Sequence, residues 1–193
     1  MDPAQALTRY LYVAHDAVRW KLDGLSEYDL RRPLTDTGTN LLGIVKHLAW
    51  VELGYFGDCF DRPVDAGPSP MASDEFNTDM YAAADETPAR IWELFDQAQA
   101  TAQSTIADLG LDAEGHVPWW GDANPVTVHW IAIHMVAEVH RHLGQIDILR
   151  EGIDGSVGYR ETATNLPGPD EVDWPAYVAK LHDIADSTQT DES

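Results

Sequence analysis

Two residues with metal-binding side chains, Glu138 and His142, lie four positions apart in the segment HMVAEVHRHLGQIDILR. At about 100° per residue, a helix places them on the same stripe as the apolar residues Ile131 and Met135. A carboxylate that faces a protein interior is costly without a partner, so Glu138 needs a cation or a complete hydrogen-bond network. The spacing indicates a divalent metal site, and it leaves open a salt bridge or a satisfied polar pair.

A third candidate ligand, His47, lies in an earlier helical segment on the same face as Ile44 and Val51. Metal sites in helix bundles are built from inward-facing side chains of neighbouring helices. Two imidazole nitrogens and one carboxylate oxygen leave a divalent ion with open positions for water or substrate, as in catalytic zinc sites. Gly43 and Gly54 flank this stripe, and we expect them to let neighbouring backbones approach closely.

Five helical segments are predicted from the spacing of apolar residues and from the residues that cap them. They cover 4–22, 40–60, 87–109, 124–152 and 173–186. The region between the second and third helices is rich in Pro, Gly, Asp and Ser, which is typical of a long surface crossing, with a short helical turn at 75–81. No stretch alternates regularly between apolar and polar residues, so no strand is expected. The predicted fold is all-α, an up-down-down-up four-helix bundle with a long crossover and a short C-terminal helix.

The composition predicts one domain with a strongly acidic surface. The chain has 193 residues, of which 33 are acidic and 12 are basic, for a net charge of −21. We interpret the acids, which include Asp58 and Asp79, as a solvated coat that repels nucleic acid and anionic membranes. Residues 1–185 are expected to form the domain, and 186–193 a disordered polar tail. Because neither a signal peptide nor a membrane span is recognisable, we expect a cytoplasmic protein.

Two longer motifs carry a resemblance to a known superfamily. HxxxExxxHxGQxDxLRExIDG contains Glu138 and His142, and GTNLLGIVKHLAWVExxYF contains His47. Together they resemble the DinB-like superfamily, over residues 4–159. The resemblance implies a DinB-type four-helix bundle, often a homodimer, whose metal is held by His47, Glu138 and His142. Many relatives have histidine where this chain has Glu138. With glutamate at this position, the chain resembles the mycothiol-dependent branch of the superfamily. That branch includes the mycothiol S-transferases and the metal-binding domain of mycothiol-dependent maleylpyruvate isomerase.

This resemblance implies chemistry with a low-molecular-weight thiol. A metal-bound thiol is deprotonated at neutral pH, so the ion supplies a thiolate nucleophile. Cys59, the only cysteine, is interpreted as a buried core residue, so the thiol must come from a mycothiol-type co-substrate. We predict a metal-dependent S-transferase that acts on small electrophiles. Zinc suits the ligands best, and nickel, iron and manganese are compatible with them.

The residues by themselves leave three other functions open. A thiolate that attacks a conjugated double bond and is then eliminated gives isomerisation instead of transfer. A metal-activated water gives a hydrolase. A metal that only holds the helices in register gives a non-catalytic binding protein.

Several residues near the motifs are candidates for supporting the ligands. His134 is either a hydrogen-bond partner of Glu138 or a satisfied interior histidine. Gln145 either hydrogen-bonds within the site or simply packs. Arg141 either pairs with Glu138 or holds a substrate carboxylate, and a surface ion pair is the simpler alternative. The remaining histidines show no matched spacing and are interpreted as structural or exposed: His15, His116, His129, His140 and His182.

Three tryptophans are candidates for binding the thiol. Trp50, Trp119 and Trp120 would form an aromatic wall for a sugar-bearing thiol, and Asp122 or Asn124 would bind its hydroxyls. The alternative is that these tryptophans pack in the core or in a covering loop.

Overall fold

The computed structural model describes residues 2–121, 125–161, 163–168 and 170–189, and this part of the chain is mostly helical, as predicted. Two short strands form an antiparallel pair, and three single turns are 3-10 helices. The helices are α1 (Pro3–Leu22), α2 (Glu27–Arg31), α3 (Leu41–Phe56), α4 (Pro88–Leu109), α5 (Val128–Asp154) and α6 (Trp174–Asp186). The shorter elements are η1 (Asp58–Phe60), η2 (Pro70–Ala72), η3 (Pro118–Trp120), β1 (Glu114–His116) and β2 (Pro125–Thr127).

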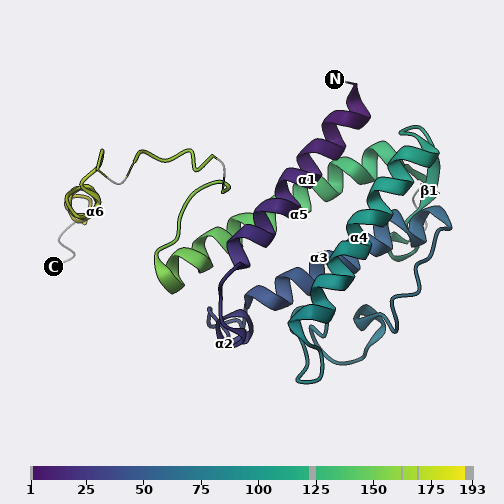
Figure 1. Cartoon of the computed structure of the whole chain (residues 1–193), viewed down its shortest axis with the longest axis horizontal. Helices are drawn as coiled ribbons and strands as arrows, with labels where there is room; N and C mark the ends of the chain where they lie inside the picture. Colours follow the sequence, from purple (N-terminus) through teal and green to yellow (C-terminus); the bar gives the residue numbers. More distant parts are fainter. Residues whose placement is uncertain (1, 122–124, 162, 169, 190–193) are drawn as a thin grey trace.

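Four long helices, α1, α3, α4 and α5, share one core. In Figure 1, α1 lies along α5 and α3 lies along α4, and α3 also packs against α5. Capping residues start two of these helices as expected. The Asn40 side chain accepts a hydrogen bond from the Gly43 amide at the start of α3, and Thr87 caps α4 ahead of Pro88. All four helices contribute fully buried side chains, which include Val18, Leu48, Phe56, Phe95, Ile131 and Met135.

The strand pair corrects two expectations. The longest helix does not start at Asn124 and Pro125; it starts at Val128, where the Thr127 side chain accepts a hydrogen bond from the Trp130 amide. Pro125 instead lies in β2, because a residue without an N–H suits a strand edge as well as a first helical turn. The pairing of β1 with β2 also shows that the expectation of no strand was wrong. Asn124 lies outside the described residues.

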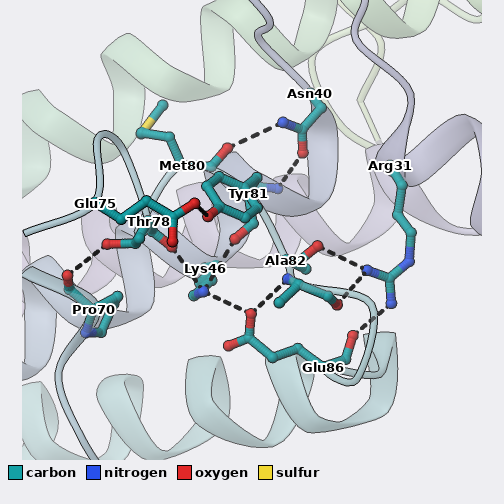
Figure 2. Close-up of polar contacts among 12 residues, drawn as sticks. Arg31, Asn40, Lys46, Pro70, Glu75, Thr78, Met80, Tyr81, Ala82 and Glu86 are labelled. Atoms are coloured by element: carbon teal, nitrogen blue, oxygen red, sulfur yellow. Dashed lines mark hydrogen bonds and ion pairs between the residues drawn. The ribbon is translucent and has the colours of Figure 1, made fainter. Parts of the chain in front are cut away.

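The crossover between α3 and α4 is fastened to α3 by side-chain bonds to its backbone (Figure 2). Lys46, 4% exposed, donates to the carbonyls of Thr78 and Tyr81 at 2.8 and 3.0 Å, and to the Glu86 carboxylate at 2.7 Å. Asn40 donates to the Met80 carbonyl at 3.0 Å. The predicted helical turn at 75–81 is absent from this described segment, whose single helical turn is η2. Buried polar groups therefore hold an irregular segment in place.

The two glycines of α3 have different roles. A Cβ on Gly43 would lie 1.8 Å from the Met80 carbonyl oxygen, so this glycine lets the crossover backbone approach the helix. At Gly54 the nearest atom is a ring carbon of Trp119, 3.2 Å from the position of a Cβ. The expected close approach of backbones therefore holds at Gly43, whereas Gly54 makes room for a side chain.

Helix α6 lies apart from the four long helices in Figure 1, and every residue in it is exposed. That residues 1–185 form a single domain remains a prediction. Of the tail predicted at 186–193, residues 190–193 lie outside the described residues. In the described part of the chain, no helix has the length and apolar character needed to cross a membrane.

Candidate metal centre

The three predicted ligands come together between α3 and α5. One ligand atom from each of His47, Glu138 and His142 lies within 4.8 Å of the other two. Glu138 Oε1 is 3.1 Å from His142 Nε2 and 3.5 Å from His47 Nε2. Because α5 presents residues four apart on one stripe, Glu138 and His142 face α3 together, and His47 meets them from its own helix.

Both histidines use their other ring nitrogen for a hydrogen bond. His47 Nδ1 lies 2.6 Å from Asp79 Oδ2, and His142 Nδ1 lies 2.8 Å from Gln145 Oε1. An ionised carboxylate and an amide oxygen only accept, so each Nδ1 carries the proton and donates it. Nε2 of each ring is then the nitrogen that faces the centre and that a metal ion would bind through its lone pair.

The electrostatics of Glu138 also suit a cation. Burial raises the pKa of the Glu138 carboxyl, but electrostatic attraction to His142 and hydrogen bonds with His47 and His142 outweigh burial. Its pKa therefore lies below the ordinary value, and the group is ionised at neutral pH. Two lone pairs and a carboxylate that converge on one point repel each other unless a proton or a cation lies between them. The donor set fits a divalent ion with open coordination positions.

A cavity of about 760 Å³ adjoins the three ligands, and His47 and Glu138 form part of its wall. Trp50 and Trp119, two of the predicted thiol-binding residues, also line it, as does His134, the predicted partner of Glu138. The crossover also contributes to the lining, through Val64, Ser69, Met71 and Ala72. Together these residues make a chamber large enough for a small organic molecule beside the candidate metal ligands.

The other predicted binding residues are not part of the described cavity lining. Trp120 is not among the described residues that line the cavity; it packs edge-on against Tyr55 and Trp130. Arg141 is exposed on α5 and pairs with neither Glu138 nor any other described acid. Gln145 is exposed as well, but its hydrogen bond to His142 links it to the centre. Asp122 and Asn124 lie outside the described residues.

His134 packs among aromatic rings. It stacks on Trp130 with ring centroids 5.4 Å apart, and it meets Tyr55 edge-on at 4.8 Å. Within the described structure no hydrogen bond joins His134 to Glu138. This packing supports the interpretation of His134 as an interior histidine. It does not support a role as hydrogen-bond partner of Glu138.

Sequence reasoning missed Asp79, which it assigned to the solvated coat. Its side chain is only 19% exposed, and it contacts a histidine 32 positions away in the sequence. Helical periodicity carries no information about such a contact, because Asp79 lies in the irregular crossover. The contact depends on the bonds from Lys46 and Asn40 that hold Thr78, Met80 and Tyr81 against α3.

A second buried pair, His15 and Glu52, lies between α1 and α3 and was also missed as a pair. His15 Nε2 is 3.1 Å from Glu52 Oε2, and both side chains are almost fully buried. The distance is short enough for an ion pair, but the atoms are not aligned for a hydrogen bond. The unbonded Tyr12 hydroxyl is buried there too, and we interpret the cluster as structural because it lies outside the described lining of the 760 Å³ cavity.

Comparison with known proteins gives a family for this chain. A family model described as Mycothiol-S-transferase matches residues 6–155, a region that includes all three candidate ligands and Asp79. No curated protein and no solved structure gave a significant match. Because the match covers most of the chain and agrees with the resemblance carried by the two histidine motifs, the chain belongs to the mycothiol S-transferase family.

Proposed function

We propose that the protein is a divalent-metal-dependent transferase that joins a mycothiol-type thiol to a small electrophile. The observation that carries this proposal is the convergence of His47, Glu138 and His142 at the wall of a 760 Å³ cavity. Membership of the mycothiol S-transferase family supports the transferase activity and the thiol. The metal, the nucleophile and the ligand roles rest on the geometry.

His47 and His142 would hold the ion through Nε2, and Glu138 would hold it through a carboxylate oxygen. A divalent ion bound there acidifies a coordinated thiol, so that it is a thiolate at neutral pH. Asp79 and Gln145 fix the two imidazole rings by accepting their Nδ1 protons. Zinc is the metal that we propose, because two nitrogens and one oxygen with open positions are typical of catalytic zinc.

The protein itself supplies no competing thiol nucleophile. Cys59 is buried, and burial raises the pKa of its thiol to about 12. At neutral pH it is therefore protonated and shielded from solvent. The nucleophilic sulfur must come from a co-substrate, which Trp50 and Trp119 in the cavity lining would contact with their apolar rings.

We further propose that α1, α3, α4 and α5 form a DinB-type up-down-down-up bundle, with the segment between α3 and α4 as its long crossover. The shared core and the pairing of α1 with α5 and of α3 with α4 support this arrangement. A homodimer and a cytoplasmic location are further proposals; the first rests on the resemblance alone, and the second rests on the expectation from the sequence. Sedimentation velocity tests the dimer, and fractionation of cells tests the location.

The test compares thiol conjugation with metal content. The purified protein is stripped with a chelator, reloaded with zinc, and assayed for conjugation of mycothiol to 1-chloro-2,4-dinitrobenzene. We expect His47→Ala to lose both metal retention and turnover, whereas His129→Ala, which removes an exposed histidine of α5, retains both. Unchanged turnover in His47→Ala with metal still bound would end the proposal.

A spectroscopic experiment separates thiol chemistry from water chemistry. Cobalt replaces zinc, and mycothiol is titrated while the absorption spectrum is recorded. A new thiolate-to-cobalt charge-transfer band supports a thiol ligand. No band, together with hydrolysis of esters or amides without added thiol, would instead favour a metal-dependent hydrolase.

A further inference from the structure

The cavity beside the candidate metal centre has an uneven charge. None of its described lining residues is Lys or Arg, whereas two of them, Asp58 and Glu138, are acidic. Much of the remaining wall is apolar or aromatic, with Trp50, Trp119 and Met71 among its larger side chains. A carboxylate in this space would have no lysine or arginine side chain to pair with.

The basic residues of the neighbouring elements are already engaged or point elsewhere. Lys46, one residue before His47, is buried against the crossover and bonds to Glu86 (Figure 2). Arg62, close to η1, pairs with Asp108 at 2.7 Å. Arg141, the candidate for binding a substrate carboxylate, is exposed on α5 and is absent from the described cavity lining.

A bound metal ion does not change this balance. In the proposed function, the two positive charges of a divalent ion are matched by Glu138 and by the thiolate of the co-substrate. The carboxylate of a second substrate would then meet Asp58 and the field of a protein with a net charge of −21. Moving such a group out of water without a partner is unfavourable, whereas an aromatic ring gains from contact with the tryptophans.

We infer that the cavity selects uncharged, apolar electrophiles, such as haloaromatics, and rejects electrophiles that carry a carboxylate. This inference rests on the proposed function for the transfer step, and on the cavity alone for binding. In that step, the thiolate sulfur bonds to the ring carbon that bears chlorine, the carbon–chlorine bond breaks, and chloride leaves with the electron pair. The thiol proton goes to solvent. The same charge balance disfavours isomerisation of a dicarboxylate.

A matched pair of electrophiles tests the selection. 2-Chloro-1,3-dinitrobenzene and 4-chloro-3,5-dinitrobenzoate differ by one carboxylate, and each kcat/KM with mycothiol is divided by the uncatalysed rate constant of the same reaction. We expect a preference for the uncharged compound of about tenfold or more, because like charges repel strongly in a partly buried site. An equal ratio, or a preference for the benzoate, would overturn the inference and leave thiol transfer intact.

Binding provides a readout that does not need turnover. 1,3-Dinitrobenzene and 3,5-dinitrobenzoate have no leaving group, and quenching of the cavity tryptophans, checked by equilibrium dialysis, reports their affinities for the metal-loaded and stripped protein. Tighter binding of the uncharged compound without conjugation of either chloro compound supports the cavity inference and contradicts the proposed transfer. Equal or tighter binding of the benzoate overturns the inference, whatever the activity.

Two lysine variants, one inside the cavity and one outside it, test whether the charge of the cavity lining determines the selection. Met71→Lys places a cation of similar length at the cavity, and Ile148→Lys adds the same charge at an exposed position of α5. We expect Met71→Lys to raise the affinity for 3,5-dinitrobenzoate relative to 1,3-dinitrobenzene several-fold, and Ile148→Lys to leave the ratio unchanged. The same increase in both variants would show a general charge effect and contradict selection by the cavity.

Discussion

Asp79 Oδ2 lies 2.6 Å from His47 Nδ1, so a residue of the irregular crossover orients a histidine of α3 whose Nε2 faces Glu138. The two residues are 32 positions apart in the chain. Carboxylates that accept the second ring proton of a metal-binding histidine fix its orientation and make it a better ligand. The crossover thus supports the candidate metal centre as well as connecting two helices.

Replacing Asp79 by alanine is expected to weaken zinc binding roughly 10- to 100-fold, because the His47 ring loses the acceptor that holds its Nδ1 proton. Competition with a chromogenic chelator measures the affinity. Asp79→Asn should retain more of it, since an amide oxygen also accepts, and Asp74→Ala, which removes an exposed acid of the same segment, should have little effect. Equal affinities in the alanine variants of Asp79 and Asp74 would show that the contact does not matter for the metal.

Cys59 is expected to be unreactive in the folded protein at pH 8, because its thiol is buried and has a pKa of about 12. Alkylation by iodoacetamide, followed by mass spectrometry, should be slow until a denaturant is added. Cys59→Ser should also retain thiol conjugation, since the proposed nucleophile is a co-substrate. Fast alkylation without denaturant, or loss of conjugation with the fold intact, would contradict this assignment.

The same pKa predicts how stability depends on pH. The folded-state pKa of Cys59 is raised above its ordinary value of 9.0, so folding favours the neutral thiol. This contribution to stability is fully present below pH 9 and is lost progressively as the pH rises from 9 toward 12. In urea unfolding across this range, Cys59→Ala should lose less stability than the parent protein.

The buried pair of His15 and Glu52 is expected to be needed for folding. Glu52→Ala leaves a buried histidine without its partner, and the expected loss is about 3–5 kcal/mol in the free energy of unfolding. Urea titration measures the loss, and a double-mutant cycle with His15→Ala should show strong coupling. Glu93→Ala, which breaks an exposed pair with Arg90, should cost less than about 1 kcal/mol. Additive effects at His15 and Glu52 would mean that the pair is not coupled.

Two glycine-to-alanine changes should have opposite effects on stability. Gly43→Ala would place a Cβ 1.8 Å from the Met80 carbonyl oxygen, so the crossover must shift, at a cost of about 1–3 kcal/mol or more. Gly144 lies inside α5 with nothing within 4 Å of the position that a Cβ would take, and Gly144→Ala should stabilise the helix by about 0.5–1 kcal/mol. Thermal unfolding of both variants tests this, and a stable Gly43→Ala protein would contradict the close approach.

Much of the helical architecture could be predicted because it depends on local rules. Asn40 and Thr87 cap their helices through bonds to amides three residues away, and residue types that favour such local bonds can be recognised in a sequence. The start of α5 was misplaced because Pro125 suits both a helix start and an edge strand. Only pairing with β1 decides between them, and that pairing is not local.

The sequence by itself determined that His47, Glu138 and His142 are candidate ligands, because helical periodicity puts residues four apart on one face and the motifs carry a family resemblance. Only the tertiary structure decided that Asp79 meets His47, and that the adjoining cavity has no lysine or arginine in its described lining. Both follow from where the crossover lies, and Lys46 and Asn40 set its path through bonds to its carbonyls. A helix repeats every 3.6 residues, whereas an irregular segment has no period, so its long-range contacts leave no local pattern in the sequence.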